Sequence, residues 1–355
     1  MSARPDSAEL RVGIVGFGRL AREFYVPALR MLPGLRVVAV ADPLPASRDA
    51  AAARVPGAVI HADPHALVAE TALDGVLVAS PPSTHLDLWR AATARGIAAF
   101  VEKPLVLASE LDALDGRESD RRVMVDFNRR FWPPYLRLGA LVRDGALGRP
   151  VDVDFSLVLD VLGWSQVTRH RLEDREGGLL HDLGCHAIDL ATELVGEAPA
   201  AVAAEITSRR SPGDHVRLRL QFASGGSAVC ELGYDARTRE RLAVRGPLAT
   251  AWFIEPNAAL HLEPAGARSS RIAGMLRDAA HLGYRGIRRS QSIGRASVRG
   301  ALAAFTAALR DGTPFSPGRE DGVRNAHIVA AALQSAAHGG AVTTLRLRRG
   351  SGASA

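Results

Sequence analysis

The chain has 355 residues, of which 47% are hydrophobic, and this length is enough for two domains that each bury a core. No apolar run approaches the roughly 20 residues that cross a bilayer, and the first ten residues lack the apolar centre of a signal peptide. The two cysteines are too few for a disulfide framework. A cytoplasmic protein with reduced thiols is therefore expected. The net charge of +6 comes from arginines spread along the whole chain without a nucleic-acid recognition motif, which argues against a nucleic-acid-binding protein.

Residues 1–126 alternate short apolar runs with helical stretches. The runs typical of strands cover residues 10–15, 35–42, 58–63, 74–80, 98–104 and 121–127, and helices are expected near residues 19–31, 46–54 and 83–95. Alternation of this kind predicts an α/β fold with a doubly wound parallel sheet. We therefore assign residues 1–126 to an N-terminal Rossmann domain.

The pattern changes after residue 126. A polar loop around residues 160–176 precedes a helix near 177–195, and strand-like runs with short turns then cover residues 200–208, 215–222, 226–234 and 241–246. The spacing of these runs favours antiparallel hairpins. Two helices near 296–311 and 320–338 and a last strand-like run at 341–347 complete a second α/β domain, residues 127–347, and a flexible tail, residues 348–355, follows.

A glycine-rich turn follows the first strand. Gly16, Gly18 and Ala21 fill the G-x-G-x-x-G/A pattern of a dinucleotide site, in which the helix N-terminus faces the pyrophosphate. A glycine turn with a purely structural role is the alternative, since the pattern also occurs without a ligand. The loop residues expected to bind the dinucleotide are Gly16, Phe17, Gly18, Arg19 and Leu20.

An acid ends the second strand at Asp42, 24 residues beyond Gly18. A carboxylate at this place accepts hydrogen bonds from the ribose hydroxyls of the dinucleotide. Because it also repels a 2′-phosphate, NAD is the expected cofactor and NADP is less favoured. Because Arg48 is a cation close by in the sequence, NADP remains an alternative cofactor.

The fourth strand ends in the loop Ser80-Pro81-Pro82-Ser83-Thr84-His85. In an open α/β sheet this end of a strand faces the ligand crevice. We expect Ser80, Pro81 and His85 to contact the cofactor. Capping of the next helix, or a position at the surface, is the alternative for His85.

Lys103 is the only lysine among the 44 basic residues of the chain. It lies with Glu102 at the end of the fifth strand, where both are expected to meet the cofactor. An ammonium group is a compact point charge whose pKa can be tuned, which a guanidinium is not. The simpler alternative is that Lys103 is a surface residue that remained a lysine by chance.

The helix expected near residues 177–195 carries several ionisable residues. Asp182, His186 and Asp189 fall at i, i+4 and i+7 on one helical face, an arrangement that suits proton transfer. His181 and Cys185 add groups that resemble metal ligands. Because all of these lie within two turns of one helix, span more than one face and have no partner cysteine pair elsewhere, no metal is expected.

Taken together, these motifs resemble the Gfo/Idh/MocA oxidoreductases, a family named for glucose-fructose oxidoreductase and inositol dehydrogenase. The resemblance implies an NAD-binding Rossmann domain and a C-terminal α/β domain whose open, largely antiparallel sheet binds substrate and often forms the subunit interface of a dimer or tetramer. It also implies catalysis by Lys103, Asp182 and His186. The motifs that carry the resemblance are GFGRLA, Ala41-Asp42-Pro43, the SPPSTH loop, the EKP triplet, Asp126-Phe127-Asn128-Arg129-Arg130-Phe131, GGLLHDLGCHAID and Asp311-Gly312-Thr313-Pro314.

The three candidate catalytic residues match the chemistry of a secondary alcohol. A neutral imidazole at His186 can take the hydroxyl proton as hydride leaves carbon. The ammonium of Lys103 can stabilise the developing alkoxide, and the carboxylate of Asp182 can orient the hydroxyl. The expected activity is hydride transfer between nicotinamide and a secondary alcohol or ketone of a sugar, a cyclitol or a nucleotide-sugar.

Other residues are expected to line the substrate pocket together with the catalytic three. The arginines among them can equally form surface salt bridges. These additional residues are Asn128, Arg129, Arg130, Trp164 and His170.

Two other functions fit the same motifs. One is a ligand-binding regulator that keeps the dinucleotide fold without turnover, and the other is an NAD-dependent redox glycosidase. Residues 265–300 add a separate feature, because they hold eight arginines against one acid, Asp278. This segment is either a solvated basic face or a site for an anionic or phosphorylated ligand or partner.

Overall fold

The structure is a computed structural model that describes residues 9–114, 122–161, 178–235, 238–254, 259–266 and 290–346. The chain divides into two compact units. The first unit consists of Met1–Phe131 and Gly294–Ala326, and the second consists of Trp132–Ile293 and His327–Ala355.

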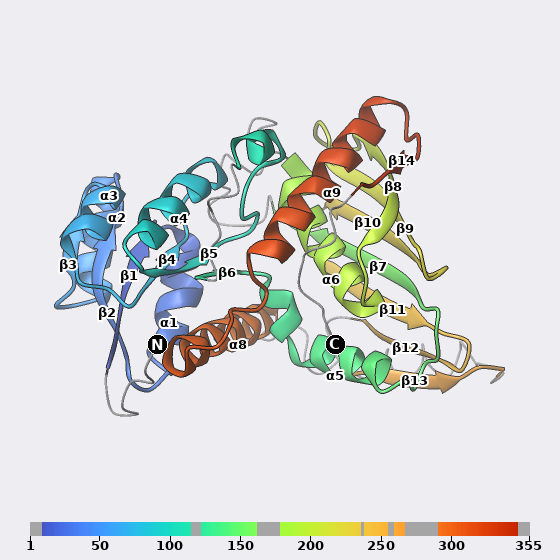
Figure 1. The fold of residues 1–355 in the computed structure, drawn as a ribbon, viewed down its shortest axis with the longest axis horizontal. Helices are drawn as coiled ribbons and strands as arrows, with labels where there is room; N and C mark the ends of the chain where they lie inside the picture. Colours follow the sequence, from blue (N-terminus) through green and yellow to red (C-terminus); the bar gives the residue numbers. More distant parts are fainter. Residues whose placement is uncertain are drawn as a thin grey trace. The chain divides into compact units, whose positions relative to one another are not determined.

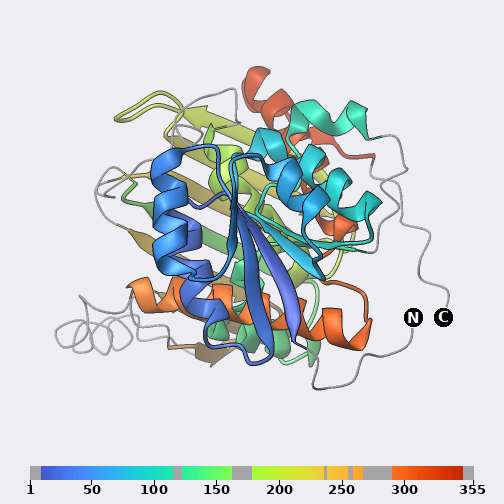
Figure 2. The same ribbon diagram turned by 90° about the vertical axis from the view of Figure 1, so that its left-hand side faces the viewer.

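The first unit contains a parallel sheet in the order β3-β2-β1-β4-β5-β6, and helices flank both sides of its strands (Figure 2). This result confirms the doubly wound sheet. The strand order reverses between β1 and β4, which is the place where ligands bind in such sheets. The strands are β1 Leu10–Val15, β2 Leu35–Ala41, β3 Val59–His61, β4 Gly75–Val78, β5 Ala98–Val101 and β6 Val123–Val125.

The helices of the first unit include one unexpected α-helix and one π-helical turn. The unexpected α-helix is α3, Pro64–Glu70. The π turn, η1, replaces the start of the helix expected at residues 19–31, and in it the N–H of Val26 donates to Ala21 O. The helical elements are η1 Ala21–Tyr25, α1 Val26–Leu29, α2 Pro45–Arg54, α3 Pro64–Glu70, α4 His85–Ala94 and the 3-10 turns η2 Pro82–Thr84, η3 Ala108–Ala113 and η4 Asn128–Phe131.

Helix α8, Ser290–Asp311, belongs largely to the first unit, although the sequence analysis places it in the second domain. The fully buried ring of Phe305 packs between Phe100 and Phe315, with ring centroids 5.4 and 5.3 Å away. Arg310 also donates to the carbonyl oxygens of Pro33 and Gly34. The hydrophobic face of α8 therefore packs against the core of the first unit, whose other residues are far from α8 in the sequence.

The second unit is built on an eight-stranded sheet in the order β13-β12-β11-β7-β10-β9-β8-β14. Among its described pairs only β7 and β10 run parallel, so the predicted, largely antiparallel sheet is confirmed. Strands β7, β12 and β13 were not anticipated. The strands are β7 Asp152–Leu159, β8 Pro199–Thr207, β9 His215–Phe222, β10 Ser227–Tyr234, β11 Arg239–Arg245, β12 Ala249–Ile254, β13 His261–Pro264 and β14 Thr343–Thr344.

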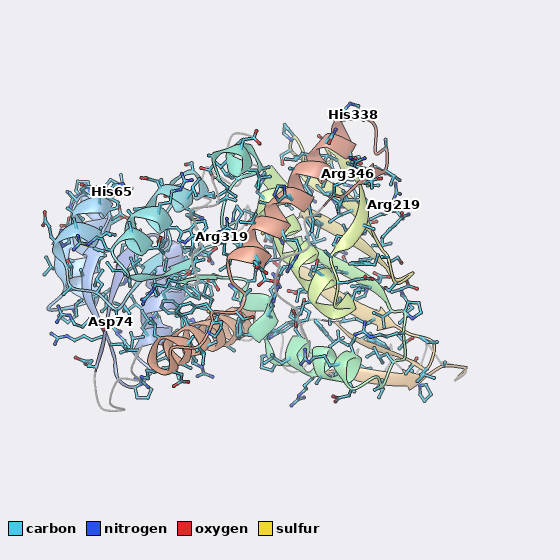
Figure 3. The ribbon with its side chains drawn as sticks, viewed as in Figure 1. His65, Asp74, Arg219, Arg319, His338 and Arg346 are labelled. Atoms are coloured by element: carbon cyan, nitrogen blue, oxygen red, sulfur yellow. The ribbon has the colours of Figure 1, made fainter. Side chains whose placement is uncertain are left out.

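Helices α5 and α6 cover one face of this sheet (Figure 1). They span Pro133–Arg143 and Cys185–Val195, and α9, Arg319–Ala337, begins in the first unit and ends in the second. Along β9 the inward side chains are buried, whereas Arg219, on the opposite face, is partly exposed (Figure 3). Within the described ranges, no helix is long and apolar enough to cross a membrane.

Candidate active site

The glycine loop of the first unit is tight at Gly16 and open at Gly18. Gly16 has a φ of +85°, and a Cβ there would lie 2.6 Å from the carbonyl oxygen of Ala79, so only glycine fits. A Cβ at Gly18 would have no heavy atom of the described chain within 4 Å. The loop thus packs against β4 at its first glycine and leaves space at its second, as pyrophosphate binding requires.

Asp42 links the end of β2 to this loop. Its carboxylate is 7% exposed, and its Oδ2 accepts the N–H of Phe17 at 2.7 Å while Oδ1 accepts the N–H of Leu44 at 2.8 Å. A carboxylate has about four acceptor positions, so both oxygens retain capacity for ribose hydroxyls. The guanidinium of Arg48 donates to the carbonyl oxygens of Asp42 and Pro43 at 3.0 and 2.8 Å.

The remaining loop residues are held by the protein itself. The Phe17 side chain is fully buried in the core, and Leu20 packs against the same core. Arg19 forms an ion pair with Glu23 one helical turn later, at 3.0 Å. Phe17 and Leu20 therefore offer a cofactor mainly their backbone.

His85 has an internal role that differs from the expected cofactor contact. It is completely buried, with Nδ1 2.8 Å from Pro104 O and Nε2 2.9 Å from Ser80 O. Burial lowers its pKa, against the opposing influence of these two carbonyl groups. Because both ring nitrogens face backbone carbonyls, His85 joins the loop after β4 to the loop after β5. Pro81, another residue expected to contact the cofactor, is exposed.

Lys103 follows β5 and is partly exposed. Its backbone N–H donates to Glu102 Oε2 at 3.0 Å, which anchors the lysine to the acid beside it. The loops after β1, β4 and β5 all lie at the carboxyl ends of the parallel strands, so the first unit gathers the candidate cofactor residues at one edge of its sheet.

Asn128, Arg129 and Arg130, expected in the substrate pocket, form the 3-10 turn η4. Arg130 pairs with Asp321 at 3.1 Å, as in the salt-bridge alternative, but its side chain is mostly buried and does not lie at the surface. Burial raises the pKa of Asp321, but the charge of Arg130 and the N–H of Gly318 outweigh it and hold this pKa below its ordinary value. Asn128 hydrogen-bonds to Asp126. The predictions for Trp164 and His170 lie outside the described residues.

The second unit contains the buried pair Asp182 and His186, 6% and 7% exposed. Asp182 lies in a π-helical turn, η7, Leu180–Gly184, and His186 lies one residue into α6. The helix expected near residues 177–195 is thus confirmed, but it contains a π turn in which the N–H of Cys185 donates to Leu180 O five residues earlier. Single π turns are frequent at functional sites.

Tyr234 is a partner of Asp182 that the sequence analysis missed. Its hydroxyl donates to Asp182 Oδ2 at 2.8 Å, and both side chains are buried. Tyr234 continues the inward-facing positions of Cys230 and Leu232 on β10. A tyrosine at an inward position needs a polar partner for its hydroxyl, which is the signal that points to this contact.

Other ionisable groups surround the pair. His181 and Asp189 are also buried, at 5% and 4% exposure, and the thiol of Cys185 donates to Asp182 O at 3.4 Å. Within the described part of the chain, no group of three or more histidine, cysteine, aspartate or glutamate side chains is arranged to hold a metal ion.

Comparison with known proteins identifies the family. A model for oxidoreductases with an NAD-binding Rossmann fold matches residues 10–127, and a model for the C-terminal domain of the same family matches residues 135–251. The chain belongs to the Gfo/Idh/MocA oxidoreductase family. The resemblance seen in the sequence motifs is therefore confirmed over both units.

Individual members of the Gfo/Idh/MocA family resemble the chain over different lengths. An inositol 2-dehydrogenase from Rhizobium meliloti is 27% identical over 92% of this chain and 97% of its own. The inositol 2-dehydrogenase 4 of Saccharopolyspora erythraea is 38% identical, but the match spans only 41% of this chain and 44% of that relative.

Solved structures of the family share the fold. A levoglucosan dehydrogenase in complex with NADH and levoglucosan has a TM-score of 0.79 and 23% identity, covering 95% of this chain and 100% of that one. A myo-inositol dehydrogenase from Corynebacterium glutamicum has a TM-score of 0.76 and 24% identity, covering 95% and 99%. Similarity at this level of identity establishes the architecture.

The geometry of Asp42 predicts the effect of removing its carboxylate. Asp42→Ser should weaken NAD binding about tenfold or more, because hydrogen bonds to a charged acceptor contribute roughly 1.5–3 kcal/mol. NADP binding should change less, since the serine no longer repels a 2′-phosphate. Calorimetric titration of both dinucleotides measures the difference, with Asp49→Ser on the exposed face of α2 as the control. Equal NAD affinity in variant and parent would place the ribose elsewhere.

Proposed function

We propose that this protein is an NAD-dependent dehydrogenase or reductase acting on a secondary alcohol or ketone of a sugar, cyclitol or nucleotide-sugar. The observation that carries this proposal is the buried Asp182–His186 pair, a carboxylate and an imidazole in the interior of the second unit. Buried polar groups of this kind are costly and concentrate at functional sites. Family relatives named inositol 2-dehydrogenases support the substrate class.

The first unit fits a bound dinucleotide. The backbone of Gly16 and Gly18 would face its pyrophosphate, and Asp42 would bind its ribose, which favours NAD over NADP. When bound, NAD supplies the acceptor for the hydride. The chain itself must bind the substrate and move the hydroxyl proton.

We assign the proton transfer to His186, which takes the hydroxyl proton as its carbon is oxidised. Tyr234 donates to Asp182 and so restrains the orientation of that carboxylate, which would in turn orient the substrate hydroxyl. Lys103 stabilises the negative charge that develops on the substrate oxygen. In the reverse direction the same ammonium polarises the carbonyl group and His186 returns the proton.

A substrate screen tests the proposed function. Purified protein with NAD and a panel of cyclitols and sugars, including myo-inositol, scyllo-inositol and levoglucosan, should accumulate NADH with at least one member. A redox glycosidase would cleave a glycoside without net NADH, and a regulator would bind NAD without turnover. Either of these outcomes would contradict the proposal.

We also propose a homo-oligomer formed through the open face of the eight-stranded sheet. This face carries partly exposed ion pairs, including Arg219 with Glu205 at 2.8 Å and Arg241 with Asp154 at 2.8 Å. Paired charges of both signs suit a self-complementary two-fold contact. Light scattering at several salt concentrations measures the subunit number.

An anionic ligand or partner at residues 265–300 stays a prediction from the sequence. Six of the eight arginines lie outside the described residues. The other two, Arg295 and Arg299, lie on α8, and Arg299 Nη1 is 3.7 Å from the sulfur of Met31.

A further inference from the structure

Three polar side chains meet in the interior of the first unit, next to Lys103. Tyr25 comes from η1, Glu102 follows β5, and Asp126 follows β6. Tyr25 and Asp126 are completely buried. The Tyr25 hydroxyl donates to Asp126 Oδ2 at 2.9 Å and lies 3.4 Å from Glu102 Oε1.

The register of the sheet forces the two acids together. Val101 and Val125 are directly paired on β5 and β6, so Glu102 and Asp126 occupy neighbouring positions just beyond the strand ends. Their carboxyl groups interact directly, and a hydrogen bond between them requires a proton on one of the two. We call Glu102 and Asp126 the acid pair.

Asp126 is the member that carries the proton. Its Oδ1 is buried and has no hydrogen-bond partner among the described residues, so an ionised carboxylate here would leave part of its charge uncompensated. Burial, followed by the negative charge of Glu102, raises the pKa of Asp126 well above its ordinary value. Ionising both acids would place two like charges side by side in the interior.

The acid pair is connected to Lys103 through Glu102. Glu102 Oε2 accepts the backbone N–H of Lys103, so the contacts run from Tyr25 and Asp126 through Glu102 to the lysine backbone. His85, the first residue of α4, lies close enough to Glu102 for the two charges to interact, and its Nδ1 is 2.8 Å from Pro104 O. Among the described residues, the titratable groups that act on the acid pair are therefore Tyr25 and His85, and Asn128 adds a hydrogen bond to Asp126.

We propose that Asp126 and Glu102 share one proton at neutral pH, and that this protonated acid pair is a positioning device for Lys103. The part of the proposal that concerns Lys103 rests on the proposed function, whereas the shared proton does not. With Asp126 neutral, Glu102 receives two hydrogen bonds, one from Asp126 and one from the backbone of Lys103. Loss of the proton would leave two like charges that repel each other, and this repulsion would weaken the hydrogen bond between Glu102 and the backbone N–H of Lys103.

The shared proton gives a pH dependence of definite sign. In the unfolded chain Asp126 ionises near its ordinary pKa of 3.8, whereas in the folded protein its pKa is raised. The contribution of Asp126 to stability is therefore fully present below the unfolded pKa and falls as the pH rises toward the folded pKa. An amide at this position keeps the donor and loses this pH dependence.

Melting temperatures measured at pH 5 and pH 8 test the shared proton. The melting temperature of Asp126→Asn relative to the parent should rise by roughly 3 °C or more over this interval. Glu102→Gln should shift in the same direction, because it removes the like charge. Asp49→Asn, an exposed acid on α2, is the matched control and should show a constant difference. If Asp126→Asn behaves like this control, the acid pair holds no shared proton.

Turnover tests the positioning role. Asp126→Ala leaves Glu102 without its donor, and its kcat should fall about tenfold because of a small displacement of Lys103. Asp126→Asn should keep at least about five times the kcat of Asp126→Ala, since the amide restores the donor. Equal kcat values for the two variants would overturn the positioning role. The melting experiment does not involve hydride transfer, so its failure is distinct from a failure of the proposed function.

Discussion

Lys103→Arg should lower kcat at least about a hundredfold, although the variant keeps the positive charge. A guanidinium is wide, planar and always protonated, whereas an ammonium is a compact donor. A misplacement of the reacting oxygen on the order of 1 Å costs about a hundredfold in rate. Losing a preorganised donor to the developing oxyanion adds roughly 3–4 kcal/mol.

Lys103→Met separates charge from geometry. If the position of the ammonium matters, Lys103→Met and Lys103→Arg should be similarly impaired in kcat. Both variants should bind NAD as the parent does, because the dinucleotide rests on Gly16, Gly18 and Asp42. Turnover within about threefold of the parent for Lys103→Arg, a barrier difference of only ~0.65 kcal/mol, would mean that Lys103 is not catalytic.

His186→Asn should lower kcat by about a hundredfold to ten-thousandfold, the usual contribution of a general base. Asparagine is polar and of similar reach, but its amide cannot accept the hydroxyl proton. NAD affinity should stay unchanged, because the proposed contacts to the dinucleotide come from Gly16, Gly18 and Asp42. Steady-state turnover together with calorimetric titration of NAD checks both expectations.

His181→Asn is the matched control for this variant. His181 is buried to a similar degree and lies five residues earlier, in η7, so the substitution makes the same chemical change in nearly the same surroundings. Its kcat should stay within about tenfold of the parent, below the general-base range. A larger loss for His181→Asn than for His186→Asn would transfer the role of base to His181.

The parallel sheet of the first unit could be predicted because its strands are buried on both faces. Such strands read as continuous apolar runs, and β1, β4 and β5 were placed within a few residues of their bounds. The glycine loop and Asp42 were predicted for the same reason, since their roles depend on where a strand ends. The packing of α8 on Phe100 was not predictable, because a hydrophobic helix face does not reveal its distant partner.

The candidate site could be predicted in its residues but only partly in its geometry. The π turns at Ala21–Tyr25 and Leu180–Gly184 differ from α-helices by one residue in hydrogen-bond spacing, which the side-chain pattern does not encode. His85 reads as a polar loop residue, yet both of its nitrogens face backbone carbonyls. The acid pair could in principle be predicted from the sequence, because Glu102 and Asp126 directly follow two strands that lie side by side in the parallel sheet.

Direct transfer of deuterium from substrate to cofactor tests the central claim. A substrate that reduces NAD in the screen is labelled with deuterium at the carbinol carbon, and the NADH that forms is analysed by mass spectrometry. Hydride transfer to nicotinamide predicts one deuterium in each NADH. NADH that contains no deuterium, or no reduction of NAD by any sugar or cyclitol while NAD binding is intact, would contradict a dehydrogenase acting on a secondary alcohol.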